Sequence, residues 1–325
     1  MNEARLHKGI WLFAPAEPFA RDYDQGSKAI ANMCDHLARG GFDLINLCVK
    51  MKDGYLSYAT RIGIVNPVFA GWDPLEVFCL EAQKHNIKIH PWFCIHAEGE
   101  GSALLRGNTS VHKITKDGPT GAVCMMRDEA QDYEFSLYKE VMERYAIAGV
   151  HLDYIRTGAG MCVCDYCTNW VRRELGKVPS DIALNEGVEE FNLWCEWRTA
   201  NITRFVKRIH DEAGRRNLRV SAAVLKDYPA CIISNGQDWV EWAEKRIVDY
   251  LFPMNYSTRT AFVIKNARIH QAVVGDQCEV WQGLGTWRTI EQAQAMKQLG
   301  FKGVVFFQSK DKPLTDADLK ALATM

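Results

Sequence analysis

The chain has 325 residues, 47% of them hydrophobic, and its 39 basic residues nearly balance its 40 acidic residues. This balance argues against a general nucleic-acid-binding protein, which needs a basic face to collect phosphates. No apolar run approaches the ~20 residues that cross a bilayer, and no apolar stretch follows a basic segment near the N-terminus. We therefore expect a cytoplasmic protein with neither nucleic acid nor a membrane as a partner. Its eleven cysteines, an odd number, fit a reducing compartment better than a disulfide framework.

Short apolar runs alternate with amphipathic segments along the chain, which is typical of a parallel sheet covered by helices. The predicted strands are Gly9–Ala14, Phe42–Val49, Ile87–Ile95, Gly149–Ile155, Arg219–Leu225, Tyr250–Asn255, Glu279–Leu284 and Gly303–Gln308. Predicted helices lie near 26–39, 73–85, 132–147, 187–214, 237–246, 261–272, 289–299 and 315–324. This pattern predicts an α/β fold, a single (β/α)8 TIM barrel forming one domain over residues 1–325, with a doubly wound open sheet as the alternative.

Two predicted connections are long, residues 96–131 after the third strand and 156–186 after the fourth. In a barrel, the loops that follow strands lie on the C-terminal face, where this fold builds its active sites. Long loops in such places are usually functional. We therefore expect the site to lie beside these two loops.

The predicted fourth strand, GVHLDYIR at 149–156, is the most informative segment. Alternate residues of a strand face opposite sides, so His151 and Asp153 would point into the barrel while their neighbours face the helices. A carboxylate at the mouth of a barrel has no apolar packing role, and burying it without a partner is costly. Asp153 is therefore a candidate functional group. The alternative is a structural aspartate satisfied by backbone amides or Arg156.

This strand and three later motifs resemble those of a bacterial family of glycosyl-hydrolase-like TIM barrels. GVHLDYIR is followed by a CxCxxC cluster, and the later motifs are WRTANITRFV from residue 197, DYLFPMNYS from 249 and GVVFF from 303. Their order and spacing together are fairly specific. The resemblance implies a carbohydrate-active barrel in which Asp153 matches the family's fourth-strand acid. It does not identify a substrate, because a fold does not fix a function.

Most glycosidases need two carboxyl groups, one to protonate the leaving oxygen and one to act as nucleophile or to activate water. The resemblance makes Asp153 the expected general acid/base. The candidate partners are Asp227, after the fifth predicted strand, and Glu98, after the third. Glu279 begins the seventh strand, which is the wrong end of the barrel for a nucleophile.

The mouth end of the seventh strand reads QGLG at 282–285, where some barrel glycosidases carry a glutamate. This departure leaves a two-glutamate retaining mechanism in doubt. One hypothesis is substrate assistance, in which an acetamido group of the substrate is the nucleophile and Asn255 or Tyr256 orients it.

Sugar sites combine aromatic faces with a few placed polar groups, and both occur near the predicted strand ends. The predicted substrate-binding residues are Trp92, Tyr154, Arg156, Asn255, Tyr256, Trp281 and Gln308. Each aromatic ring among them could equally pack in the core. Lys50 and His96 extend the predicted polar ring, whereas His90 and His151, earlier in their strands, are expected to be interior histidines.

Three cysteines, Cys162, Cys164 and Cys167, lie within six residues on the long loop after the fourth strand. Thiolates at this spacing can converge on one soft metal ion, which needs a fourth ligand, and Cys124 in the other long loop is the candidate. The arrangement is similar to the zinc-binding cluster of certain barrel β-galactosidases. We expect a structural zinc and no organic cofactor; the alternative is free thiols shielded by packing.

The leading functional prediction is a glycoside hydrolase acting on an oligosaccharide or glycoside, with a carbohydrate substrate as its expected partner and its oligomeric state left open. A non-catalytic carbohydrate-binding barrel is one alternative, and another barrel hydrolase or lyase using Asp153 and histidines is a second. Phosphate chemistry is disfavoured, because no glycine-rich phosphate cup or dinucleotide-binding motif is evident.

Overall fold

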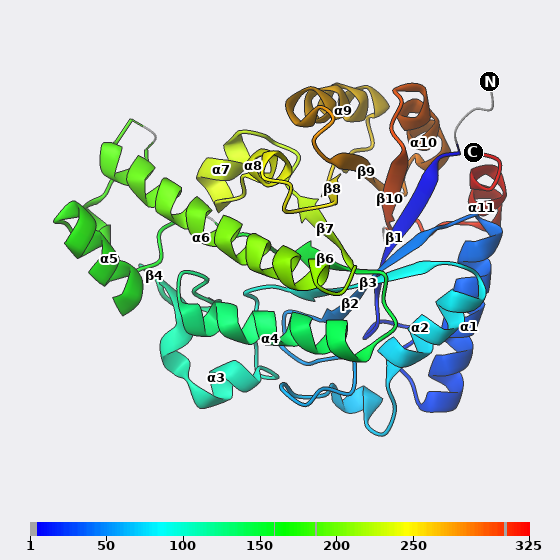
Figure 1. The fold of residues 1–325 in the computed structure, drawn as a ribbon, viewed down its shortest axis with the longest axis horizontal. Coiled ribbons are helices and arrows are strands. Elements are labelled where there is room, and N and C mark those ends of the chain that lie inside the picture. The colour runs from blue at the N-terminus through cyan, green and yellow to red at the C-terminus, as the bar shows by residue number, and fades with distance from the viewer. Residues whose placement is uncertain (1–4, 159, 186, 309–310) are drawn as a thin grey trace.

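A computed structural model describes residues 5–158, 160–185, 187–308 and 311–325. Its centre is a closed barrel of parallel strands in the order β1-β2-β3-β6-β7-β8-β9-β10 (Figure 1). The strands are β1 (His7–Phe13), β2 (Leu44–Lys50), β3 (Lys88–Cys94), β6 (Gly149–Asp153), β7 (Arg219–Val224), β8 (Tyr250–Pro253), β9 (Glu279–Gly285) and β10 (Gly303–Phe307). Gly9 pairs with both Leu44 and Val305, which closes the barrel. The predicted TIM barrel is confirmed.

Helices cover the outside of the barrel, and all eight predicted helices are present. They are α1 (Tyr23–Arg39), α2 (Pro74–Lys84), α4 (Asp128–Arg144), α6 (Glu189–Gly214), α8 (Trp239–Glu244), α9 (Thr260–Val274), α10 (Thr289–Gln298) and α11 (Asp316–Leu322). Local sequence sets several of their ends. The Asp73 side chain caps the first turn of α2 ahead of Pro74, and Thr315 forms a capping box with Asp318 at α11.

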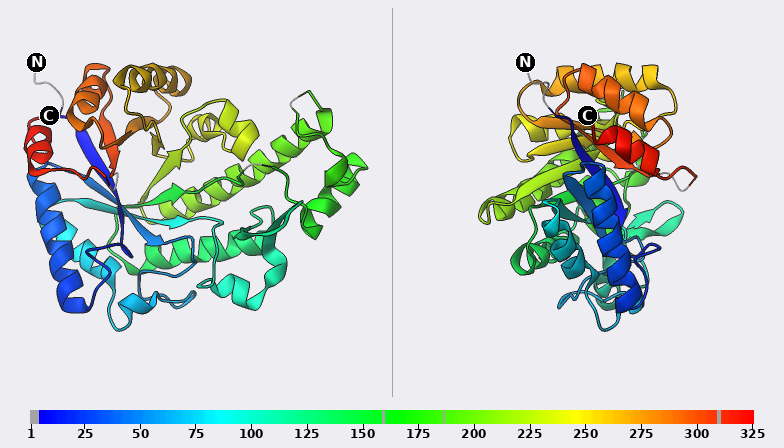
Figure 2. Two further views of the ribbon diagram at one scale, coloured as in Figure 1. Left: turned by 180° about the vertical axis from the view of Figure 1, so that it is seen from behind. Right: turned by 90° about the vertical axis from the view of Figure 1, so that its right-hand side faces the viewer.

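The two long connections contain secondary structure that the sequence did not predict. After β3 come α3 (Ala103–Gly107) and an antiparallel hairpin of β4 (His112–Thr115) and β5 (Gly118–Val123); after β6 comes α5 (Asp165–Leu175). A short helix α7 (Ala230–Asn235) follows β7, and 3₁₀ turns occupy Pro67–Phe69, Thr109–Val111 and Pro179–Asp181. Figure 2 shows α5 and the first turns of α6 projecting well beyond the barrel. The long connections are therefore an ordered extension of one side of the barrel.

The barrel interior is a packed core of large side chains. Trp11, Trp92, Phe252 and Trp281 form this cluster with Cys48, Cys94 and Val305, among others, while a larger cluster fills the layer between strands and helices. His151 lies inside, as predicted from the alternation of β6. It accepts a hydrogen bond from the Trp11 indole (2.9 Å).

His90 and His151 are interior histidines, as predicted. Their Nδ1 atoms lie 3.0 and 2.9 Å from the Ser221 hydroxyl. Burial lowers the pKa of His90 to about 3 and that of His151 well below its usual value, so both rings are neutral.

No helix within the described residues has the length and apolar character that a membrane crossing needs.

Candidate active site

Asp153 is the last residue of β6, at the C-terminal mouth of the barrel, and only 9% of it is exposed. Its Oδ1 atom accepts a hydrogen bond from the Tyr154 backbone amide (2.6 Å) and lies 4.0 Å from the Arg156 guanidinium. Burial raises the pKa of Asp153, although Arg156 and the Tyr154 amide act in the opposite direction. A raised pKa favours the protonated form of a carboxyl group, and this is the form in which a general acid acts.

Tyr154 and Arg156 lie directly beside this carboxyl group, and their contacts with it are of the kind that the structural alternative for Asp153 predicts; substrate binding by these two residues stays a prediction. Two cations lie near the Tyr154 ring, with the Arg156 guanidinium 4.6 Å and the Lys52 ammonium 5.1 Å from its centroid. Cations at these distances are attracted to the face of an aromatic ring. Lys52 was not predicted as a site residue, because an exposed lysine in a loop carries no distinguishing sequence signal.

A group of half-buried aromatic rings forms a second part of the mouth. Tyr256 stacks on Phe307 with centroids 5.3 Å apart, and Phe307 meets Phe13 edge-on at 6.1 Å. The pKa of Tyr256 is raised by burial and then by the charge of Asp153, which places the phenol near that carboxyl group. Gln308 directly follows Phe307 and is half-buried. The sequence analysis missed Phe13 and Phe307 because each is the last residue of an apolar strand and looks like core. The only available signal was strand alternation, which places their side chains on the inner face of the barrel.

Two tryptophans predicted to bind substrate lie inside the barrel instead. Trp92 is 2% exposed and donates its indole hydrogen bond to the Asn46 carbonyl (3.2 Å). Trp281 lies at the opposite end from the mouth, where it stacks on His7 at 5.5 Å and lines a cavity of about 260 Å³. Its position early in β9 explains the error, because the start of a barrel strand lies at the N-terminal face. Neither indole can form a sugar platform at the mouth.

Asn255 is also not available to a ligand. It is fully buried, donates to the Val263 carbonyl (2.9 Å) and the Gln282 side chain (3.1 Å), and accepts from Asn266 (3.0 Å). Its amide therefore ties β8 to α9 and β9. Because these bonds use both ends of the amide, the prediction that Asn255 orients a substrate group is wrong.

Glu98 belongs to a buried ionic cluster with Lys50 and Glu134, and the side chains of all three are fully shielded from solvent. The Lys50 ammonium binds Glu98 Oε1 and lies 2.6 Å from Glu134 Oε1. Burial and the neighbouring Glu98 charge raise the pKa of Glu134 to about 8, against the effect of Lys50. Glu98 is therefore not free to activate water, and Lys50 is not part of an open polar ring.

Asp227 follows β7 as predicted but faces solvent. Its side chain is 64% exposed and forms an ion pair with Lys226 at 3.2 Å. None of the contacts found among the described residues joins Asp227 to Asp153. Of the two predicted partners, only Asp227 is accessible to a substrate.

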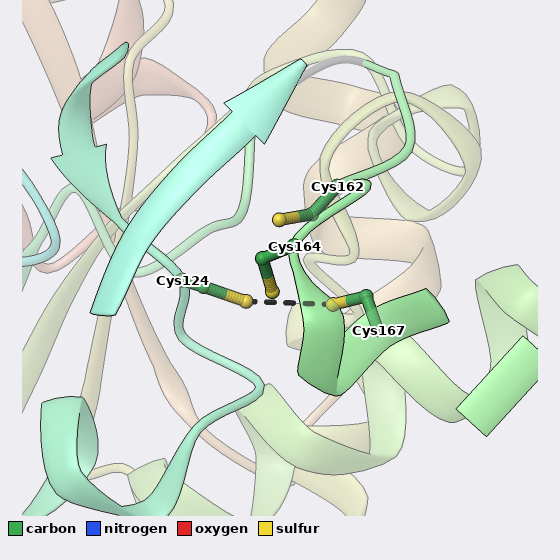
Figure 3. A group of neighbouring side chains, drawn as sticks. All are labelled: Cys124, Cys162, Cys164 and Cys167. Carbon is green, nitrogen blue, oxygen red and sulfur yellow. Dashed lines mark hydrogen bonds between the residues drawn. The ribbon is translucent and has the colours of Figure 1, made fainter. Parts of the chain in front are cut away.

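The four predicted metal-binding cysteines come together beside the mouth. Cys124 directly follows β5, Cys164 precedes the first residue of α5, and Cys167 lies in its first turn. All four are buried, and their sulfur atoms lie within 4.8 Å of one another. Figure 3 shows the thiols of Cys124 and Cys167 pointing toward each other, 3.5 Å apart, with Cys164 between them. This group can hold a metal ion.

The closed barrel with a carboxyl group at its mouth is a TIM barrel, and the family match places it in the class of glycosyl-hydrolase-like barrels. Residues 66–284 match the family described as Glycosyl hydrolase-like 10, and the chain belongs to that family. Glycosyl hydrolase DigH of Escherichia coli K12 is 26% identical over 270 residues, which cover 70% of this chain and 58% of DigH. The chain therefore matches little more than half the length of that relative.

Solved structures support the fold at low sequence identity. The glycoside hydrolase domain of PgaB (BpsB) from Bordetella bronchiseptica has a TM-score of 0.71 at 12% identity, covering 95% of this chain and 94% of that domain. The catalytic domain of β-amylase from Paenibacillus polymyxa has a TM-score of 0.66 at 11% identity, with 98% and 97% covered. At these identities the likeness concerns the barrel alone.

Proposed function

We propose that this chain is a glycoside hydrolase acting on an oligosaccharide or glycoside, with Asp153 as its general acid/base. The observation that carries the proposal is a buried carboxyl group of raised pKa at the barrel mouth, near the Tyr256 and Phe307 rings. Membership of a glycosyl-hydrolase-like family supports the same reaction class.

In the proposed reaction, protonated Asp153 donates its proton to the oxygen of the scissile glycosidic bond. The Arg156 guanidinium and the Tyr154 amide then stabilise the carboxylate that remains. Tyr154, Tyr256 and Gln308 are the proposed substrate contacts, because aromatic faces pack against the C–H groups of sugars.

The second group of the reaction has two remaining candidates. Asp227 is the accessible carboxylate, and its use requires the substrate or the loop after β7 to bring it toward the scissile bond. The other candidate is an acetamido group of the substrate; with Asn255 already bonded, only Tyr256 would remain to orient it.

A panel of glycans and aryl glycosides, tested with wild-type protein and with Asp153→Asn, examines the proposal. General acid catalysis contributes about 10²–10⁴-fold, so the variant should lose at least about 100-fold in rate on any substrate that is cleaved. Asp276→Asn, which changes an exposed aspartate after α9, is the matched control.

Binding without cleavage by wild-type protein would favour the carbohydrate-binding alternative, and undiminished cleavage by Asp153→Asn would refute the proposed role. Asp227→Asn tests the second carboxylate. Cleavage of a sugar without a 2-acetamido group would eliminate substrate assistance.

We also propose that Cys124, Cys162, Cys164 and Cys167 bind a structural zinc ion. Tetrahedral zinc with Zn–S distances of about 2.3 Å holds its sulfur ligands about 3.8 Å apart. The observed sulfurs, all within 4.8 Å of one another, need only small shifts to reach this spacing. Because the four thiols would occupy every position of a tetrahedral ion, none is left for a substrate.

The surroundings of the four thiols suit a bound metal. Four thiolates and one zinc ion carry a net charge of −2, and the positive charges of Lys113 and Arg127 act on these sulfurs. The hairpin and the cysteine loop also meet directly, since the Val163 amide donates to the Ile114 carbonyl (2.8 Å). A metal here would fix the two long connections to each other.

Metal analysis of protein purified without chelator is the test, and one zinc per chain is expected. Cys164→Ser should lower the zinc content, whereas Cys231→Ser, which changes a buried thiol after β7, should not. Absence of zinc together with four thiols that react freely in the folded protein would contradict the proposal.

A further inference from the structure

His96 and Tyr154, which closely follow the neighbouring strands β3 and β6, both have a left-handed backbone. Their φ angles are 65° and 54°. The other described non-glycine residues with positive φ are Asn86, Asn217 and Arg246, and each lies within three residues of a helix end, where this conformation is ordinary. Bulky residues rarely adopt it elsewhere, and where they do, the surrounding structure must hold them.

The His96 ring holds the Tyr154 turn directly. Its Nδ1 atom lies 2.9 Å from the Tyr154 carbonyl oxygen. Since a carbonyl can only accept, Nδ1 carries the proton and donates it. Burial lowers the pKa of His96 to about 3, so the ring is neutral and this tautomer is kept across the physiological range.

The buried ionic cluster in turn holds the His96 turn. The His96 backbone amide donates to Glu134 Oε1 (3.1 Å), the same oxygen that accepts from the Lys50 ammonium (2.6 Å). Lys50 also binds Glu98, so the acceptor of the His96 amide is fixed by a cluster with no exposure to solvent. The His96 turn is thus attached to a rigid part of the barrel.

The opposite end of this chain of bonds is Asp153. The Tyr154 backbone amide donates to Asp153 Oδ1 (2.6 Å), and the left-handed turn at Tyr154 orients the peptide groups on both sides of that residue. We propose that His96 is a positioning residue for Asp153, held in place through its backbone by Glu134. The proposal rests on the proposed function, in which Asp153 is the acid/base.

The test compares His96→Gly with His96→Asn. Glycine adopts the left-handed conformation without strain, so His96→Gly removes the ring bond and should still fold. Asparagine tolerates the same conformation and offers a side-chain N–H donor, so it should restore part of the activity. His112→Ala is the matched control, because His112 makes the same kind of ring contact, to the Thr120 carbonyl (3.2 Å), within the hairpin.

Two readouts are needed, a crystal structure of each variant and the pH profile of hydrolysis. Loss of the Tyr154 amide bond disfavours the charged form of Asp153, so its pKa should rise and the alkaline limb of the profile should move to higher pH. Five other titratable or charged groups act with Asp153 and are unchanged in His96→Gly: Arg156, Lys52, Tyr256, Cys48 and Tyr138. A misplaced acid should lower kcat by up to about 100-fold.

The proposal predicts that Tyr154 and Asp153 move in crystals of His96→Gly and that the alkaline limb shifts. Unmoved residues would overturn it, as would reduced activity with an unshifted limb, which is the result of a merely structural role. If Asp153→Asn keeps its activity, the proposed function fails, while the crystal comparison still decides whether His96 positions the Asp153 side chain.

Discussion

Replacing Lys50 by methionine tests the buried ionic cluster most directly. The substitution keeps an unbranched side chain that is one atom shorter and removes the cation that binds both Glu98 and Glu134. Two carboxyl groups are then left in the same fully buried site. Breaking a buried ion pair by removing one partner costs about 3–5 kcal/mol, because the remaining charge is uncompensated.

This cost can be expressed as a melting temperature. Unfolding entropy is about 2.1 cal/mol/K per residue, so a chain of 325 residues has about 0.7 kcal/mol/K. A loss of about 4 kcal/mol then lowers the melting temperature by about 6 °C. The loss should be smaller at pH 5 than at pH 8, because both carboxyl groups can become neutral by binding protons at the lower pH.

Thermal unfolding of Lys50→Met, followed by circular dichroism at pH 5, 6.5 and 8, checks both expectations. Lys84→Met is the control, since Lys84 is 63% exposed and its ion pair with Glu81 should contribute little. A Lys50→Met cost no larger than that of the control, or one that is independent of pH, would refute the reasoning.

Three further predictions concern the same molecule. The pKa of Glu134, raised from 4.5 to about 8, means that the folded chain binds this proton more tightly than the unfolded chain. Wild-type stability should therefore fall as the pH rises from 4.5 to about 8, and Glu134→Gln should flatten that fall in denaturation curves. Removing the proposed zinc with a chelator should speed proteolysis within residues 96–127 and 154–188, and restoring zinc should reverse the effect. Tyr256→Ala should raise KM about tenfold or more on a cleaved glycoside, whereas Phe262→Ala, on the exposed face of α9, should not.

The features that sequence predicted well depend on short-range patterns. Alternation placed His151 inside the barrel and Asp153 at its mouth, and the spacing of Cys162, Cys164 and Cys167 indicated that their thiols come together. Cys124 was found because loops after neighbouring strands share one face of a barrel. These inferences need only the period of a strand and the topology of the fold.

The features that sequence missed depend on contacts between distant segments. Glu134 lies on α4 in a stretch that reads as the polar face of an amphipathic helix, 84 residues from the lysine that binds it. Asn255 looked available because its partners, Gln282 and Asn266, are 27 and 11 residues away. Burial and pairing of a polar side chain are tertiary properties, and no local pattern specifies them.

The left-handed turns at His96 and Tyr154 also bear on protein engineering. A bulky residue in this conformation costs about 1–3 kcal/mol, so glycine or asparagine at either position would relax the backbone. A screen for thermal stability alone would therefore select such replacements. A replacement at His96 would remove its ring contact with the Tyr154 carbonyl, and one at Tyr154 would remove the ring that contacts Arg156 beside Asp153. Variants of this barrel gained by heat selection should be checked first at these two positions for lost function.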